Sequence, residues 1–295
     1  MRVILAEHLG MCFGVRDAIA LALEQSKAGP MTILGDLVHN ETVLADLRRR
    51  GIRVSQHAAE VQTKAVMITA HGASEKALER ARSRGLKVRE ATCPLVHVAH
   101  QAVAMLVREG YHPVIIGKRD HVEVRGITED LAEFDVVLSA EDVLALRERK
   151  KFGVAAQTTQ PIERVEELVE LIRQRFPESE VRFIDTVCRP TKQRQTAAMG
   201  LAEQSDVVVV IGGAHSNNTQ ELVKTCRRYC ARVFHVQTAA DLCEEWFINA
   251  QTVGITAGTS TPDSTISAIQ RWLKNYAAKH ERFQTESAQL PALTT

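Results

Sequence analysis

The chain of 295 residues is long enough for one large domain or for two or three small ones, and its formal net charge of +1 argues against a broad nucleic-acid-binding surface. No apolar run approaches the roughly 18 residues that a membrane span requires, and the first residues are strand-like and unlike a secretion signal. We therefore expect a soluble, cytoplasmic protein that binds neither nucleic acid nor membranes.

Short apolar runs alternate with amphipathic helical patterns along the chain. The expected strands are 2–6, 31–35, 65–70, 113–117, 135–139, 152–156, 181–187, 206–212, 232–236 and 252–257. Most are apolar on both faces, as buried parallel strands are. The expected helices between them include 15–25, 41–50, 74–84 and 162–175. This alternation predicts an α/β fold, whereas 281–295 lacks a pattern and is expected to be a loose C-terminal tail.

Three of the six cysteines share one local setting, the passage from an extended segment to a helix. These residues are Cys12, Cys93 and Cys188. The positive end of a helix favours the thiolate, which is the form that binds metals or acts as a nucleophile. Their spacing is about one small α/β unit each, so we infer three similar units that each offer one cysteine to a common centre. The predicted boundaries of these units are 1–93, 94–188 and 189–280.

Three convergent thiolates without a fourth disfavour a closed four-cysteine zinc site. They suit a cubane iron–sulfur cluster with one open iron, which would be a Lewis acid attached to an electron reservoir. A cysteine nucleophile would explain one junction but not three. Cys226, Cys230 and Cys243 are interpreted as core or surface residues, with a metal pair at the first two as the alternative.

Polar residues follow the predicted strands, at the edge where parallel sheets bind ligands. They are His39, His71, His121, Glu123, Thr158, Thr159, Ser216, Asn217, Asn218 and Ser260. Each alone is an ordinary turn or cap residue, but together they predict a pocket for an oxygen-rich anion such as a diphosphate. Glu123 would then carry the proton, with Thr158 or Thr159 as a hydroxyl relay. His97 is expected to be solvated, and His100 to pack against the site or support it.

From Cys12 to about residue 276, the sequence resembles the 4-hydroxy-3-methylbut-2-enyl diphosphate reductase family, the last enzyme of the non-mevalonate isoprenoid route. The matching segments are 12-CFGVRDAI-19, 35-GDLVHNETV-43, 69-TAHGAS-74, 91-ATCPLVHVAH-100, 121-HVEVRG-126, 157-QTT-159, 185-DTVC-188 with 194-RQ-195, 216-SNN-218 and 256-TAGTSTPD-263. ATCPLV and the last segment are the specific ones. The resemblance implies a trefoil of three α/β units around a central [4Fe-4S] cluster, with Cys12, Cys93 and Cys188 as its ligands.

The resemblance also implies roles for the polar residues. Those at positions that contact the diphosphate or the rest of the substrate are His39, His71, His121, Ser216, Asn218 and Ser260, with Asn217 where a second serine often sits. Glu123 matches the proton donor, and Thr158 and Thr159 match the pair that supplies the substrate-contacting threonine. The implied reaction removes the allylic hydroxyl with two electrons and two protons and gives isopentenyl and dimethylallyl diphosphate plus water. A ferredoxin or flavodoxin would supply the electrons.

The sequence departs from the family's pattern at Phe13, in the Arg-Asp order at 16–17, at Lys118 and in the segment 189-RPT-191. Phe13 and Arg189 flank two of the cluster cysteines, where they would influence cluster access or potential. Two alternatives therefore stay open. One is a divergent paralogue with the same cluster and another phosphorylated or allylic substrate, and the other is a non-enzymatic iron–sulfur sensor. The complete polar set argues against the sensor, which would need the cysteines but not the pocket.

Overall fold

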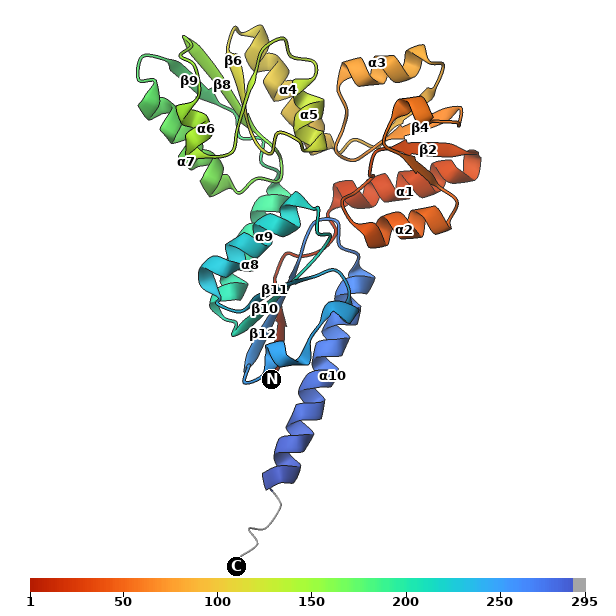
Figure 1. Ribbon diagram of the computed structural model, residues 1–295, viewed down its shortest axis with the longest axis vertical. Coiled ribbons are helices and arrows are strands. Elements are labelled where there is room, and N and C mark those ends of the chain that lie inside the picture. Colours follow the sequence, from red (N-terminus) through yellow and green to blue (C-terminus); the bar gives the residue numbers. More distant parts are fainter. Residues whose placement is uncertain (289–295) are drawn as a thin grey trace, which may run out of the picture. The chain divides into compact units, whose positions relative to one another are not determined.

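The computed structural model describes the backbone of residues 1–288 and the side chains of residues 1–280, and it contains three parallel four-stranded sheets (Figure 1). The predicted α/β fold is therefore confirmed. The chain forms two compact bodies. The large body consists of Cys12–Lys192 and holds two of the sheets, and the small body consists of Met1–Met11 with the chain from Gln193 and holds the third.

The first sheet lies in the large body. Its strands, in spatial order, are β3 (Arg53–Ser55), β2 (Met31–Leu34), β4 (Ala65–Ile68) and β5 (Lys87–Glu90). The helices of this part are α1 (Phe13–Ala28), α2 (Glu41–Arg49), η1 (Ala58–Glu60) and α3 (Glu75–Ser83). Asn40 caps α2 and Ser74 caps α3 through their side-chain oxygens, which satisfies backbone N–H groups that a helix start leaves open.

The second sheet completes the large body. Its strands, in spatial order, are β7 (Asp135–Val137), β6 (His112–Ile116), β8 (Lys151–Ala156) and β9 (Glu180–Phe183). Its helices are α4 (Pro94–Arg108), α5 (Val122–Thr128), α6 (Ala140–Leu144) and α7 (Ile162–Arg175). Alternate strand residues face opposite layers: Ile115 packs with the residues of α4 and α5, and Val114 and Ile116 pack with those of α6 and α7. The sheet is thus buried on both faces, as parallel sheets are.

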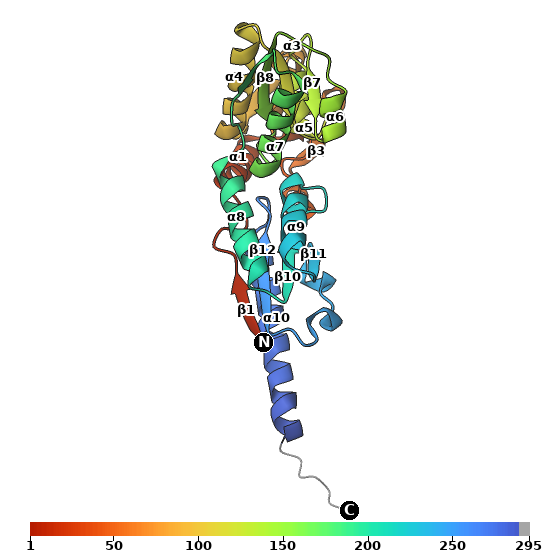
Figure 2. The same cartoon turned by 90° about the vertical axis from the view of Figure 1, so that its left-hand side faces the viewer.

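The third sheet forms the small body. Its strands, in spatial order, are β11 (Val233–Val236), β10 (Val207–Ile211), β12 (Thr252–Ala257) and β1 (Arg2–Leu5). The helices are α8 (Arg189–Glu203), α9 (Asn217–Tyr229), η2 (Ala239–Asp241), η3 (Glu244–Phe247) and α10 (Asp263–Ala288). Residues of α10 pack on one face of the sheet and residues of α8 and α9 on the other. Figure 2 shows β1 beside β12, with which it pairs in parallel.

The three sheets share one strand order, in which the third unit takes its fourth strand from the start of the chain. If the strands of each sheet are numbered in chain order, with β1 counted as the fourth strand of the third sheet, every sheet has the spatial order 2-1-3-4. Three similar α/β units are therefore present, but β1 belongs to the third sheet although the predicted first unit, 1–93, contains it. The other boundaries, at 93 and 188, stay predictions.

The remaining differences from the sequence-based expectation are local. All ten expected strands are present within a few residues. β3 and β5 were not among the expected strands, since each of these short edge strands has a single apolar residue, Val54 and Val88. Of the expected loose tail 281–295, residues 281–288 continue α10, which no glycine or proline interrupts, and 289–295 lie outside the described residues. No helix within residues 1–288 combines the length and the apolar character of a membrane span.

Candidate functional site

The three cysteines predicted to act together lie at helix starts in the large body. Cys12 is the N-cap of α1 and Cys93 is the N-cap of α4. Cys188 precedes α8, where its carbonyl accepts the N–H of Lys192 at 3.2 Å. A Cβ placed on Gly14 would lie 2.5 Å from the Cys93 Sγ, so α1 and α4 begin in direct contact. All three thiols are free and partly buried.

Burial dominates the acidity of two of these thiols. It raises the pKa of Cys93 and raises the pKa of Cys188 to about 11, and the negative charges of Cys12 and Glu123 add to both effects. The first backbone N–H groups of α4 do lower the pKa of Cys93, but by less. The helix starts do favour the thiolate, as expected, but burial outweighs their effect at these two residues.

The three thiols form a donor set that suits an iron–sulfur cluster. Cys12 acts electrostatically on both other cysteines, so the three lie near one another. In a cubane cluster each cysteine binds a different iron, so three neighbouring thiols can hold three of its irons. The donor set therefore agrees with the predicted iron–sulfur cluster.

The other cysteines are confirmed as core and surface residues. Cys226 and Cys230 are buried in the core of the third sheet with Leu222, and no third ligand completes a metal site with them among the described residues. Cys243 is exposed and donates a short hydrogen bond to Glu245.

Three histidines from three loops form a compact cluster in the large body. His39 follows β2, His71 follows β4 and His121 follows β6. Their ring centroids are 4.4, 5.2 and 5.5 Å apart. Burial lowers the pKa of His71 well below its usual value and lowers that of His121 to about 3, and the neighbouring histidines add to both effects. At neutral pH these two rings are therefore uncharged in the ligand-free protein.

The hydrogen bond to His121 indicates which ligand the cluster suits. Its Nδ1 accepts the backbone N–H of Glu123 at 3.2 Å, so the neutral ring carries its proton on Nε2. A metal at Nε2 would require the other tautomer and would break that hydrogen bond. An anion can instead accept the Nε2 proton. The buried Nδ1 of His71 has no hydrogen-bond partner among the described residues, so it is also available to a ligand.

Glu123 is a buried carboxyl group that is held by Thr158. It is 1 % exposed and accepts the backbone N–H of Thr158 at 2.7 Å and its hydroxyl at 3.0 Å. Burial raises the pKa of Glu123 to about 7, against the lowering effect of the two hydrogen bonds. The carbonyl of Thr158 accepts the N–H of Cys188 at 3.0 Å, which ties the carboxyl group to the third cysteine. Thr159 instead accepts a hydrogen bond from the Gln157 amide at 3.1 Å, so Thr158 is the threonine that contacts the acid.

The remaining predicted site residues lie in the small body, at the carboxyl ends of β10 and β12. Ser216 caps α9, and Asn218 accepts the N–H of Thr259 through its Oδ1 at 3.0 Å. The buried Nδ2 of Asn218 has no partner among the described residues. Asn217 and Ser260 are also buried, at 7 % and 4 % exposure. These polar groups therefore form an anion-compatible edge of the third sheet.

Glycines that make close approaches possible were not singled out by the sequence. Besides Gly14, a Cβ on Gly258 would lie 2.1 Å from the Thr219 Oγ1. Their signal was available, since both lie in segments that carry the family resemblance, but glycine does no chemistry of its own. The histidines outside the cluster match expectation, because His97 is exposed and His100 packs against Gly72.

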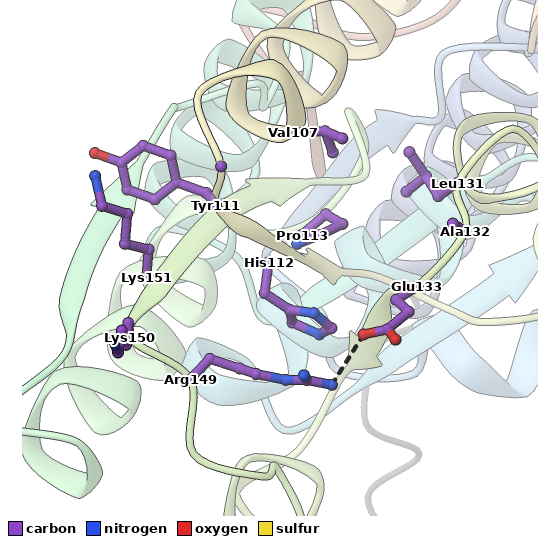
Figure 3. Close-up of a pocket in the computed structure, with 11 residues that line it drawn as sticks. Val107, Tyr111, His112, Pro113, Leu131, Ala132, Glu133, Arg149, Lys150 and Lys151 are labelled. Atoms are coloured by element: carbon purple, nitrogen blue, oxygen red, sulfur yellow. Dashed lines mark hydrogen bonds and ion pairs between the residues drawn. The ribbon is translucent and has the colours of Figure 1, made fainter.

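A separate hollow of about 400 Å³ lies at the opposite edge of the second sheet (Figure 3). It opens where β6 and β8 begin, beside His112 and Lys151, and an ion pair of 3.1 Å joins Arg149 to Glu133 at its side. None of the described residues that line it belongs to the predicted site.

Comparison with known proteins agrees with this geometry. Residues 3–274 match the model of the family described as LytB protein. The chain is 40 % identical over 272 residues to a 4-hydroxy-3-methylbut-2-enyl diphosphate reductase of Geobacter sp. (strain M21), which covers 91 % of this chain and 95 % of the relative. It is 38 % identical over 274 residues to the protein of that name from Aquifex aeolicus (strain VF5), covering 91 % and 94 %.

Two solved structures are similar over nearly the whole chain. One is a structure of (E)-4-hydroxy-3-methyl-but-2-enyl diphosphate reductase, described as the terminal enzyme of the non-mevalonate pathway. It is 36 % identical, covers 93 % of this chain and 100 % of that one, and has a TM-score of 0.68. The other is the E-1-hydroxy-2-methyl-but-2-enyl-4-diphosphate reductase from Plasmodium falciparum, which is 28 % identical, covers 92 % and 87 %, and has a TM-score of 0.86. The chain belongs to the LytB protein family.

Proposed function

We propose that this protein reduces 4-hydroxy-3-methylbut-2-enyl diphosphate to isopentenyl and dimethylallyl diphosphate. The substrate loses its allylic hydroxyl as water, and the reaction consumes two electrons and two protons. One observation carries the proposal: the large body of a chain in this family holds three neighbouring cysteines, a buried carboxyl group and a histidine cluster.

Cys12, Cys93 and Cys188 would hold a [4Fe-4S] cluster. When bound, such a cluster supplies electrons and a Lewis-acidic iron for the hydroxyl oxygen. Partial burial of the three thiols supports this role, because it limits the access of water to the cluster. Phe13 and Arg189 adjoin two of these cysteines and are exposed, so they would border the cluster and not bind it.

Glu123 would donate a proton to the departing hydroxyl group. A carboxyl group with a pKa of about 7 is protonated in a large fraction of molecules at neutral pH, as a general acid must be. The Thr158 hydroxyl lies 3.0 Å from the carboxylate Oε2 and can pass a proton between the acid and the substrate. Thr159 accepts the Gln157 amide and, as the family resemblance implies, belongs to the pair that supplies the substrate-contacting threonine.

His39, His71 and His121 would bind the diphosphate. The Nε2–H of His121 can donate to a phosphate oxygen, and a bound anion would favour protonation of the neighbouring rings. Ser216, Asn217, Asn218 and Ser260 would bind the substrate as well, as the family resemblance implies. The unpartnered amide of Asn218 supports this, because buried donors are normally satisfied.

The test is anaerobic turnover by the cluster-loaded protein. The reduced protein is mixed with 4-hydroxy-3-methylbut-2-enyl diphosphate, and electron consumption and five-carbon products are followed together. Formation of the two diphosphate products at two electrons each is the expected result. An intact cluster without turnover, with a ferredoxin or a flavodoxin as donor, would instead favour the divergent paralogue. The electron donor and the cytoplasmic location stay predictions.

A further inference from the structure

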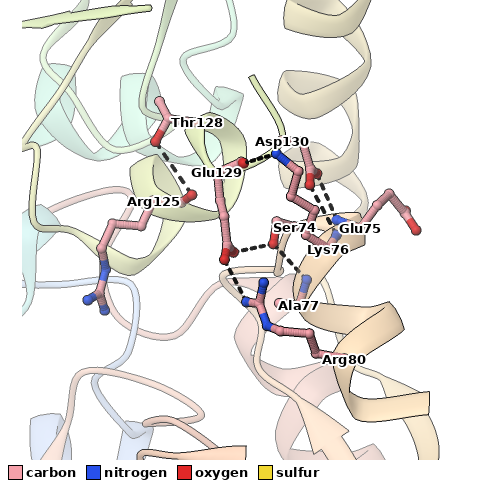
Figure 4. A network of polar contacts seen from close by, with 9 residues as sticks. All are labelled: Ser74, Glu75, Lys76, Ala77, Arg80, Arg125, Thr128, Glu129 and Asp130. Atoms are coloured by element: carbon pink, nitrogen blue, oxygen red, sulfur yellow. Dashed lines mark hydrogen bonds and ion pairs between the residues drawn. The ribbon is translucent and has the colours of Figure 1, made fainter. Parts of the chain in front are cut away.

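A polar network joins the start of α3 to the segment that follows α5 (Figure 4). We call it the α3 clamp, and its residues are Ser74, Glu75, Lys76, Arg80, Glu129 and Asp130. The Asp130 carboxylate accepts the backbone N–H groups of Glu75 and Lys76 at 2.7 and 3.1 Å. The Glu129 carboxylate accepts a short hydrogen bond from the Ser74 hydroxyl, and the Glu129 carbonyl accepts the Lys76 ammonium at 2.8 Å.

The clamp holds α3 mainly through its N-terminus. The Asp130 carboxylate accepts open N–H groups of this helix, and the Glu129 carboxylate adds negative charge near its positive end. Both effects stabilise a helix start. The Ser74 hydroxyl, which also caps Ala77 at 2.9 Å, lowers the pKa of Glu129, which keeps that carboxylate charged. The ion pair between Arg80 and Glu129 is largely exposed, so it contributes little by itself.

The clamp lies at the far end of the two segments that carry histidines of the cluster. His71 is three residues before Ser74, and the intervening Gly72 has a φ of +76° that few other residues tolerate. His121 is the N-cap of α5, whose other end leads directly into Glu129. The two segments pack closely between these ends, because a Cβ on Gly126 would lie 3.5 Å from the Ala73 Cα.

We propose that Glu129 and Asp130 are positioning residues that hold His71 and His121 at the spacing that the diphosphate requires. This inference rests on the proposed function of the histidine cluster. Without the clamp, α3 and α5 are free to separate, and the histidines spend less time in the binding geometry. The apparent affinity falls in proportion to that fraction of time. Glu123 lies on α5 as well, but its carboxyl group is held by the backbone N–H and the hydroxyl of Thr158, so we expect binding to change much more than the chemical step.

The test compares the double variant Glu129→Ala/Asp130→Ala with the matched control Glu133→Ala, which removes an exposed ion pair from the same segment but outside the clamp. In the double variant, KM and the Kd of inorganic diphosphate are each expected to rise about tenfold, or about 1.4 kcal/mol. The value of kcat should stay within about twofold and the iron content should not change. The control should match the wild type in all four quantities.

Unchanged KM and Kd, a lower kcat at unchanged KM, or a loss of iron would overturn the inference. If the double variant does not fold, Glu129→Gln/Asp130→Asn keeps an acceptor oxygen at each position and should raise KM by about threefold. The binding and turnover measurements separate the two proposals. Clamp-dependent diphosphate binding in a wild type without turnover would refute only the reaction, and normal turnover with clamp-independent affinity would refute only the clamp.

Discussion

Replacing Glu123 with glutamine removes the proposed proton donor and keeps its shape. The glutamine oxygen can still accept the backbone N–H of Thr158, which lies 2.7 Å from the carboxylate. We expect unchanged iron content and unchanged binding of inorganic diphosphate. Turnover should fall by roughly 10²–10⁴, the usual loss when a general acid is removed. Anaerobic kcat measurements on the reduced, cluster-loaded protein test this.

The same substitution should change the dependence of stability on pH. Burial raises the pKa of Glu123 from 4.5 to about 7 on folding, so the folded state binds the proton more tightly than the unfolded state. The contribution of Glu123 to the free energy of unfolding is therefore fully present below about pH 4.5 and is lost as the pH rises through 7. Since each tenfold change in proton affinity is worth about 1.4 kcal/mol, the loss is about 3 kcal/mol.

Glu123→Gln removes the group that causes this loss, so it should be more stable than the wild type at pH 8 and about equally stable at pH 5. Thermal denaturation of the two cluster-loaded proteins over this range measures the difference. Glu133→Gln, which changes an exposed carboxylate, is the control and should show no such trend. A fully active Glu123→Gln variant, or a stability difference that does not vary with pH, would refute the reasoning.

Three further substitutions test the rest of the site. Gly14→Ala should lower the iron content, because the new Cβ would lie 2.5 Å from the Cys93 Sγ. The control Gly200→Ala should keep its full iron content, because a Cβ at this helical position would have no neighbouring atom within 4 Å. Cys226→Ser should keep its iron but lose about 1–3 kcal/mol of stability, because a hydroxyl replaces a fully buried thiol; iron loss would contradict the ligand assignment. His71→Ala should raise the Kd of inorganic diphosphate at least about tenfold, since a hydrogen bond to a charged group is worth about 1.5–3 kcal/mol. Calorimetry measures this Kd, and an unchanged value would exclude the His71 ring from the anion site.

The sequence predicted what depends on local pattern and residue type. Strands such as β10, a run of valines and isoleucine that is buried on both faces, were recognisable because a parallel sheet buries both sides of its strands. The cysteines and histidines were recognisable because few other residues can do their chemistry. The edge strand β3 was not, because its half-exposed residues carry no apolar run.

Properties that depend on tertiary packing were outside the reach of the sequence. The high pKa of Cys188 comes mostly from burial, whereas the helix start, which is all that the local sequence indicates, lowers it. The strand that pairs with β1 lies about 250 residues away in the chain, and a local hydrophobic pattern cannot predict a pairing over that distance. Glu129 and Asp130 were also overlooked, since two acidic residues after a helix look like an ordinary solvated turn.

The pairing of β1 with β12 also constrains the order of folding. In the first two sheets each strand finds its neighbours within a short stretch of chain, but β1 must wait for the last strand of the third sheet. The intervening loop is about ten times longer than those within the other sheets, and closing it costs about 2 kcal/mol more in chain entropy. The large body can therefore fold while β1 is still unpaired. Completion of the third sheet is then the late, non-local step that limits the folding rate.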